Sequence, residues 1–277
     1  MEYIIEILKA IFLGIVEGVT EWLPISSTGH MILVDEFLKL NVSPEFMSLF
    51  LVVIQLGAVL AVVLIYWHKL NPFKSKNGKL HVEPEIMSMW MKIVFACLPA
   101  AIIGILFDDV FEALFYNPVT VAIMLILFGI FFIVVENRNV GRKPKVTKIS
   151  QITYQTAMII GLFQLIAAVF PGTSRSGATI VGALLIGVSR VVAAEFTFFM
   201  SIPVMFGASL LKIVKIGFNF TLMEYVILFT GMATAFIVSV IVIKLLLGYI
   251  KKNDFKVFGY YRIVLGLIVL AYFLLIK

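Results

Sequence analysis

The stretch Pro171-Gly-Thr-Ser-Arg-Ser-Gly-Ala-Thr179 interrupts a long apolar part of the chain, and this interruption decides which fold is expected. Four consecutive polar residues lie between two glycines, and a helix is predicted directly after them, from Ala178 to Gly187. The flanking apolar runs are long enough to cross a bilayer, which takes ~20 residues. Non-helical backbone at that depth is tolerated only where protein or water surrounds it. The stretch therefore predicts a membrane protein whose chain enters the bilayer, turns and leaves again on the same side.

The composition of the whole chain also indicates a membrane protein. Of its 277 residues, 62% are hydrophobic and only 14% are charged, with a mean hydropathy of +1.10, whereas a soluble domain has roughly a quarter charged residues. Continuous apolar runs exclude a β-barrel, which requires alternation. We predict an all-α polytopic protein, one integral membrane domain over residues 1–277, with two re-entrant helical hairpins and six transmembrane helices. The six predicted spans are about Met47–Trp67, Met89–Phe107, Pro118–Glu136, Phe196–Lys215, Glu224–Leu247 and Phe258–Ile276.

The charged residues between the spans predict the orientation. Basic residues gather in the loops after the first, third and fifth spans, and the second loop is acidic. The first loop contains Lys69, Lys74, Lys76 and Lys79, and the third contains Arg138, Arg142, Lys143, Lys145 and Lys148. The fifth loop contains Lys251, Lys252, Lys256 and Arg262. The acidic residues of the second loop are Asp108, Asp109 and Glu112. Such alternation places the basic loops in the cytoplasm. We therefore interpret the net charge of +6 as a topology signal and expect no nucleic-acid partner.

The two broken apolar regions, about Tyr3–Leu40 and Ile152–Ser189, resemble each other. Gly14-Ile-Val-Glu17 precedes Gly161-Leu-Phe-Gln164 by 147 residues, and the same offset pairs Pro24 with Pro171, Ser26 with Thr173 and Ser27 with Ser174. We predict two repeats, about residues 1–140 and about 150–277. Each would contain an odd number of crossings, so the second would be inverted, and such repeats place their site near the bilayer midplane. The match is short, and chance similarity of apolar sequence is the alternative.

In the first broken region, Glu17 and Glu21 are four residues apart and share one face of a helix. Two neighbouring carboxylates inside a membrane are costly unless a cation, a proton or water lies between them. Their oxygens suit a hard divalent cation, Mg²⁺ or Ca²⁺. The alternative is that both side chains reach the outer headgroup region.

Three hydroxyl residues, Ser26, Ser27 and Thr28, follow Pro24. Ser26 suits the cap at the start of a helix. Ser27 and His30 are three residues apart and could meet on one helix face, and a hydroxyl beside an imidazole is a minimal activated nucleophile. A structural role for this lone histidine is the simpler alternative.

The second broken region presents phosphate-binding groups. A glycine-flanked turn that opens a helix at Gly177 offers backbone N–H groups to an anion. Arg175 adds a planar fork of donors that suits phosphate oxygens. Hydroxyl donors come from Thr173, Ser174, Ser176 and Thr179. Arg175 could also pair with Glu17 or Glu21 and hold the two regions together, and the two roles are compatible.

With these residues named, the chain resembles the undecaprenyl-diphosphate phosphatase family of the bacitracin-resistance type. The motifs are Glu-x-x-x-Glu with Pro-x-Ser-Ser-x-x-His (Glu17 to His30) and Pro-Gly-x-Ser-Arg-Ser-x-x-Thr (Pro171 to Thr179). The resemblance implies removal of the terminal phosphate of undecaprenyl diphosphate in the bacterial inner membrane, at a site open to the outer face, and a need for a divalent cation. It implies catalytic roles for Glu17, Glu21, Ser27, His30 and Arg175, and phosphate contacts from Ser26, Thr28, Thr173, Ser174, Ser176, Gly177 and Thr179.

Two mechanisms are compatible with these residues. Ser27 could attack the phosphate, with His30 taking its proton, or water could attack directly while Ser27 binds phosphate.

A rival function is a membrane carrier, a flippase for a lipid phosphate, because inverted repeats and intramembrane charges are typical of carriers. The sequence leaves the oligomeric state open, a homodimer included.

Overall fold

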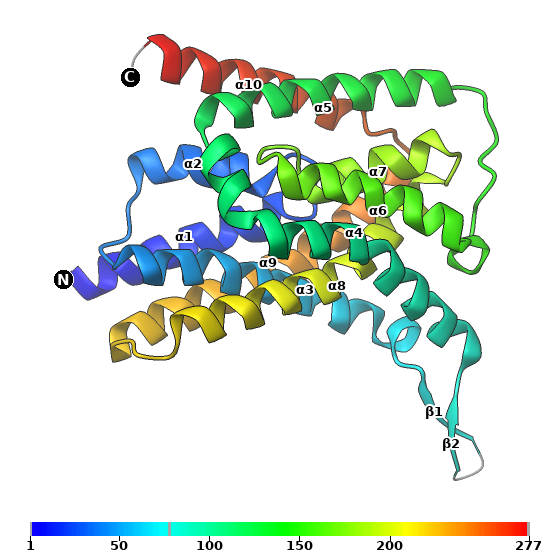
Figure 1. Cartoon of the computed structure of the whole chain (residues 1–277), viewed down its shortest axis with the longest axis horizontal. Helices are drawn as coiled ribbons and strands as arrows, with labels where there is room; N and C mark the ends of the chain where they lie inside the picture. Colours follow the sequence, from blue (N-terminus) through cyan, green and yellow to red (C-terminus); the bar gives the residue numbers. More distant parts are fainter. Residues whose placement is uncertain (1, 77–78, 276–277) are drawn as a thin grey trace.

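The computed structural model describes residues 2–76 and 79–275, and this part of the chain is almost entirely helical (Figure 1). Six helices are long and apolar enough to cross a membrane, so the chain is a multi-pass, all-α membrane protein, as predicted. The helices are α1 (Glu2–Thr20), α2 (Ser27–Phe37), α3 (Pro44–Leu70), α4 (Pro84–Phe115), α5 (Pro118–Asn139), α6 (Tyr154–Val169), α7 (Arg175–Leu185), α8 (Arg190–Ile216), α9 (Leu222–Ile250) and α10 (Lys256–Leu275), with a short 3₁₀ turn at Ile149–Gln151. The candidate spans are α3, residues 84–107 of α4, α5, α8, α9 and α10.

Several of the spanning helices begin at a residue that caps them. The Ser43 hydroxyl accepts a hydrogen bond from the Phe46 N–H, and the Asn117 side chain accepts one from Thr120, each just before a proline at the first helical position. Such caps satisfy N–H groups that have no partner within the helix. Thr221 and Glu224 form a reciprocal capping box at the start of α9. The helix starts are therefore encoded locally, in the few polar residues between the apolar runs.

Two local predictions for the connecting segments were wrong. The acidic segment after the second span is not a loop, because α4 continues to Phe115 and carries Asp109 within it. No proline or glycine occurs between Phe107 and Pro118, whose ring disfavours helical backbone at Asn117. The lysine-rich loop after α3 contains an antiparallel hairpin, β1 (Phe73–Lys76) and β2 (Lys79–Val82), with Phe73 opposite Val82.

Helices from the two halves of the chain pack closely at glycines. A side chain added at Gly14 of α1 would lie 2.6 Å from the Gly231 carbonyl oxygen of α9, and one at Gly161 of α6 would collide with the Ala96 carbonyl of α4. Between α5 and α10, Gly129 and Gly259 face each other, and a Cβ on either would lie 2.7 Å from the other's carbonyl oxygen. Small residues let membrane helices approach in this way. Each half therefore packs extensively on the other.

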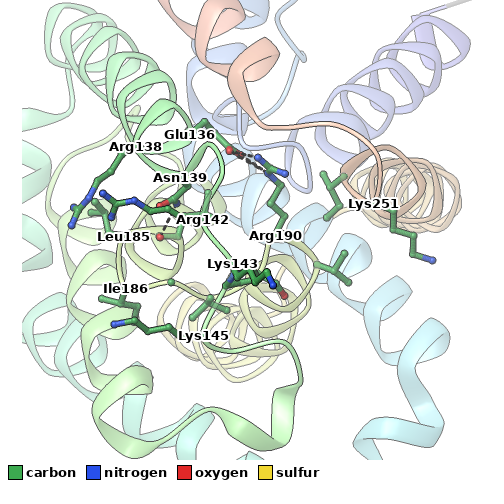
Figure 2. A pocket seen from close by; sticks show the side chains of 17 residues that line it. Glu136, Arg138, Asn139, Arg142, Lys143, Lys145, Leu185, Ile186, Arg190 and Lys251 are labelled. Carbon is green, nitrogen blue, oxygen red and sulfur yellow. Dashed lines mark hydrogen bonds and ion pairs between the residues drawn. The ribbon is translucent and has the colours of Figure 1, made fainter.

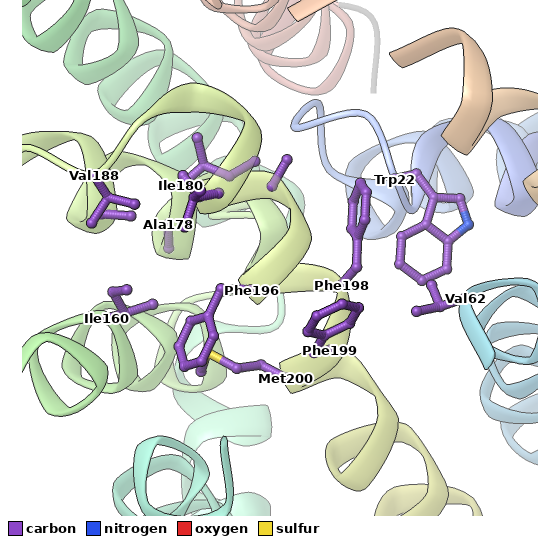
Figure 3. Packing of buried hydrophobic residues seen from close by; sticks show 14 of the residues in the cluster. Trp22, Val62, Ile160, Ala178, Ile180, Val188, Phe196, Phe198, Phe199 and Met200 are labelled. Atoms are coloured by element: carbon purple, nitrogen blue, oxygen red, sulfur yellow. The ribbon is translucent and has the colours of Figure 1, made fainter. Parts of the chain in front are cut away.

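The largest apolar core contains residues of α6, α7 and α8 together with Trp22 from the first polar turn. Trp22, which follows α1, is fully buried and meets Phe198 of α8 edge-to-face with a ring separation of 5.2 Å (Figure 3). Ala178 and Ile180 of α7 and Phe199 of α8 belong to the same cluster. The polar turns are thereby fixed in the interior by aromatic packing.

Candidate active site

The two polar turns share one unusual backbone feature. Ser26 and Ser174 have φ values of 74° and 67°, and they are the only non-glycine residues of the described ranges with positive φ. Each hydroxyl accepts a hydrogen bond from a glycine N–H three residues later, Gly29 at 3.2 Å and Gly177 at 3.1 Å. A residue with a Cβ is disfavoured in this backbone region, and the cap offsets part of that cost.

This match corrects the predicted alignment of the turns. Ser26 corresponds to Ser174 and not to Thr173, because the cap serine follows the proline by two positions in the first turn and by three positions in the second. Gly172 lies between Pro171 and Ser174 with φ of +87°, and an added Cβ there would lie 2.5 Å from the Val121 carbonyl oxygen. The first residue of α2 is Ser27 and the first residue of α7 is Arg175, so these two occupy equivalent positions.

Glu21 joins the two turns. Its Oε1 accepts a hydrogen bond from Nη2 of Arg175 at 2.8 Å, and its Oε2 accepts one from the Ser27 hydroxyl at 2.8 Å. The Ser176 hydroxyl donates to the Glu21 backbone carbonyl at 3.3 Å. Arg175 and Glu21 are largely buried, with side chains 13% and 7% exposed. The internal pairing that the sequence left open for Arg175 is thus present, and it brings together residues 154 positions apart.

Glu17 lies one helical turn before Glu21 and is buried, with 1% exposure. Its Oε1 has no hydrogen-bond partner among the described residues. Both glutamates lie in the protein interior, so the structure does not support the alternative that they reach the headgroup region.

These carboxylates fit a hard divalent cation. The described residues contain no group of three or more His, Cys, Asp or Glu side chains that could hold a metal by themselves. Magnesium, however, is often held by only one or two carboxylates, with substrate phosphate oxygens and water completing its shell. The unpartnered Glu17 oxygen, the neighbouring Glu21 and the Ser27 hydroxyl are donors of that kind.

His30 is not paired with Ser27. Its Nδ1 lies 2.7 Å from the Ser26 carbonyl oxygen, and its Nε2 lies 2.6 Å from the hydroxyl of Tyr261. The rings of His30 and Tyr261 are stacked with centroids 5.6 Å apart. The Ser27 hydroxyl instead donates to a carboxylate, so the predicted serine–histidine contact is absent from this structure.

Several predicted phosphate contacts have other partners. Thr179 is fully buried, donates to the Arg175 carbonyl at 2.9 Å and lies 2.9 Å from the hydroxyl of Thr197. The Gly177 N–H is occupied by its cap. Thr173 is also fully buried, although its hydroxyl has no hydrogen-bond partner among the described residues. Ser26 and Ser174 are caps, and Ser174 also bonds Ser176 at 3.1 Å.

Thr28 differs from these residues. It is partly exposed and has no hydrogen bond from its side chain in the described part of the chain. Its hydroxyl therefore remains available for phosphate.

Arg262 of α10 is a site residue that the sequence prediction missed. It is fully buried, and its guanidinium donates to the Pro24 carbonyl of the first turn at 3.1 Å. It also donates to the carbonyls of Gly172 and Thr173 in the second turn, at 3.0 and 2.8 Å. The sequence grouped it with the basic loop residues, but its position within an apolar run was the signal that could have identified it, since charges there face the bundle interior.

Comparison with known proteins covers nearly the whole chain. A family profile described as the bacitracin resistance protein BacA matches residues 10–268. An undecaprenyl-diphosphatase of Desulfitobacterium hafniense is 70% identical over 270 residues, covering 98% of this chain and 97% of the relative. Undecaprenyl-diphosphatase 1 of Clostridium acetobutylicum is 67% identical over 276 residues, covering both chains completely. An undecaprenyl-diphosphatase of Enterococcus faecalis is 61% identical over 267 residues, covering 96% of each.

Proposed function

The chain belongs to the family of the bacitracin resistance protein BacA, and from that premise we propose how its residues act on undecaprenyl diphosphate. The enzyme is a hydrolase of the phosphoric anhydride: it removes the terminal phosphate and leaves undecaprenyl phosphate, the lipid carrier used in cell-wall synthesis. The observation that carries the site assignment is the double contact of Glu21, which holds Arg175 with one oxygen and Ser27 with the other.

We propose that the chain is a single membrane domain built from two inverted repeats of five helices, α1–α5 and α6–α10. The matching caps at Ser26 and Ser174 support this arrangement, as does the reciprocal packing of α1 on α9 and α6 on α4. In this proposal, α1–α2 and α6–α7 are re-entrant hairpins that meet near the midplane of the inner membrane. The alternation of charged loops supports a site open to the outer face.

In the proposed mechanism, Arg175 and the neighbouring Thr28 hydroxyl bind the terminal phosphate. Phosphoryl transfer depends mostly on positioning and on neutralising charge. The guanidinium Nε is buried and has no partner among the described residues. A phosphate oxygen that enters the site would give this donor a partner while the pairing with Glu21 persists.

Ser27 then attacks the terminal phosphorus. A Ser27 Oγ–P bond forms, the anhydride P–O bond breaks, and undecaprenyl phosphate leaves. Glu21 takes the serine proton, since it already accepts that hydrogen bond. Water hydrolyses the phosphoserine in the second step, with Glu21 relaying protons. His30 is assigned to binding and orientation, because Ser26 and Tyr261 already occupy its ring nitrogens.

Glu17 and Glu21 would hold a divalent cation, Mg²⁺ or Ca²⁺. When bound there, the ion supplies positive charge that neutralises the diphosphate oxygens. The support for this assignment is the unpartnered, buried Glu17 oxygen.

The central experiment measures phosphate release by purified protein in detergent, with and without EDTA. Arg175→Ala and Glu21→Gln should abolish most of the phosphate release. EDTA should reduce release by the wild-type protein, and adding Mg²⁺ in excess of EDTA should restore it. A flippase without phosphatase activity would release none in any sample.

A second experiment tests the covalent step. Undecaprenyl diphosphate labelled in the terminal phosphate is mixed with enzyme and quenched during turnover. We expect label on Ser27 and none in Ser27→Ala. Turnover without label on Ser27 would establish direct attack by water in place of the covalent route.

A further inference from the structure

A polar pocket, drawn in Figure 2, is lined by the last residues of α7, at the end of this helix opposite Arg175. It has a volume of about 440 Å³ and is bounded by the end of α5, the segment 140–145, the end of α7, the start of α8 and the end of α9. With a rise of 1.5 Å per residue, the length of α7 places it roughly 16 Å from the polar turns. Its loops are those that the charge pattern assigns to the cytoplasmic side.

The pocket is lined by many more positive than negative side chains. Six basic residues line it: Arg138, Arg142, Lys143, Lys145, Arg190 and Lys251. The only carboxylate among the lining residues is Glu136, and it is fully engaged. It accepts hydrogen bonds from Nε and Nη2 of Arg190, at 2.9 and 2.5 Å, and one from the Phe255 N–H at 3.0 Å.

The other five basic side chains have no ion pair or hydrogen bond to any residue of the described ranges. They come from the end of α5, the following segment and the end of α9, so they surround the pocket from several sides. All five are exposed, and no carboxylate of the described residues balances their charge.

The start of α8 adds backbone donors to the same pocket. Ser189, Arg190 and Val191 all line it, and the Ser189 side chain does not cap the helix. The first N–H groups of a helix have no partner within it, and together with the helix dipole they attract anions. Here the helix has 27 residues, and its first residues line the same pocket as the five basic side chains.

The pocket wall is held in place by backbone hydrogen bonds. The N–H groups of Lys145 and Val146 donate to the Gly187 carbonyl at 2.8 and 3.2 Å, and the Ser189 N–H donates to the Val146 carbonyl at 2.8 Å. Apolar side chains, among them Leu185 and Ile186, line the pocket next to the charged groups. Charge beside an apolar surface suits an anionic headgroup whose tail lies in the bilayer.

We propose that this pocket is a second anion site, which binds a phosphate monoester group or free phosphate from the face opposite the polar turns. The site binds without hydrolysis, because its one carboxylate is held by Arg190 and the Phe255 amide and activates no nucleophile. A lipid monophosphate would place its headgroup on the basic residues and the α8 amides. Inorganic phosphate would use the same donors without the apolar contacts.

The test measures ligand binding to full-length protein by native mass spectrometry, in the Arg175→Ala background so that the polar turns contribute little. The probes are dioctanoyl phosphatidic acid, inorganic phosphate, and dioctanoylglycerol as the lipid without phosphate. Arg142→Gln/Lys143→Gln should weaken phosphatidic acid binding about tenfold or more, since each basic residue near an anionic headgroup contributes substantially. The charge-preserving exchange Arg142→Lys/Lys143→Arg should restore most of it.

The matched control removes the same charge elsewhere. Lys212→Gln/Lys215→Gln, at the other end of α8, should leave binding unchanged. An effect of the pocket variant on inorganic phosphate as well as on the lipid identifies free phosphate as a ligand, and an effect on the lipid alone identifies the headgroup. Equal weakening by the control variant, or equal binding of dioctanoylglycerol, would overturn the proposal, as would the absence of any binding of phosphatidic acid and phosphate.

Discussion

The two polar turns have the same backbone and different chemistry. Ser26 and Ser174 adopt the same left-handed conformation and cap the following helix through the same hydrogen bond. The residue after the first cap is the hydroxyl Ser27, and the residue after the second is the cation Arg175. The shared cap builds both turns, whereas the proposed reaction needs the two unlike groups that face each other. The turns therefore contain residues for folding and residues that we propose for the reaction.

The contrast extends to the helices before the turns. Glu17 of α1 corresponds to Gln164 of α6, and both are buried. The side-chain amide of Gln164 has no hydrogen-bond partner among the described residues. By contrast, Glu21, one helical turn after Glu17, contacts residues of both turns. The first turn region supplies the carboxylates of Glu17 and Glu21, and the second supplies the positively charged Arg175. In our proposal, the two together form one site.

The strongest test of this asymmetry compares Glu21→Gln with Gln164→Leu. Glu21→Gln removes the negative charge that holds Arg175 and accepts the Ser27 proton. We expect kcat for phosphate release to fall about 10³-fold, as when a preorganised charge-stabilising group is lost. Gln164→Leu removes a buried amide without partners and should leave kcat nearly unchanged. Equal losses in the two variants would remove the distinction between the turns.

Arg262 tests whether the turns are held as a pair. In Arg262→Met, the carbonyls of Pro24, Gly172 and Thr173 lose their shared donor, and an unsatisfied buried acceptor costs ~1–3 kcal/mol. We expect the free energy of unfolding to fall by about 3 kcal/mol, measured by thermal or denaturant unfolding in detergent. Arg138→Met, at an exposed arginine, should change it by less than ~0.5 kcal/mol. A similar small effect of both variants would show that packing alone holds the turns.

Arg175→Lys tests the geometry of the second turn while preserving its charge. Lysine cannot donate to Glu21 and phosphate from one planar fork. We expect kcat/KM to fall about 30-fold, a smaller effect than loss of the Glu21 charge, because Coulomb attraction remains. Steady-state phosphate release is the measurement, and full activity of the variant would mean that Arg175 acts only as a point charge.

The smallest expected effect concerns what the turns share. Ser26→Ala and Ser174→Ala each remove one helix cap and should each lower the free energy of unfolding by about 1 kcal/mol. The matched exchanges Ser26→Gly and Ser174→Gly should cost less, since glycine tolerates positive φ. Unequal losses at the two serines would indicate that the turns are not structural equivalents.

The sequence was sufficient for the broad fold, and three residues that it proposed for the site, Glu21, Ser27 and Arg175, are in contact in the structure. Six spans follow from apolar length, and the polar breaks at Pro24 and Pro171 are visible because charge and hydroxyls are rare elsewhere. The spacing of Ser27 and His30 predicted a contact between their side chains. In the structure, the Ser27 hydroxyl instead donates to Glu21, which precedes α2 in the chain. Residue spacing shows which side chains share one face of a helix. It does not show whether a side chain will instead bond a residue outside that helix.

Long-range contacts were the part that the sequence could not provide. Arg262 was counted with the lysines before it, because a charge near a span end is usually a topology signal. Its carbonyl partners lie as many as 238 residues away and have no side-chain signature. The one-residue difference between the turns was likewise hidden, since apolar sequence offers few markers for alignment.

The position of Arg262 in the chain also bears on biogenesis. Helices enter the membrane in the order of their synthesis, and α10 is the last helix of the part of the chain that the structure describes. Until α10 is made, the carbonyls of both polar turns lack the guanidinium that bonds them together. A nascent chain thus contains every reacting residue before it contains an ordered site, so the last helix inserted completes the enzyme.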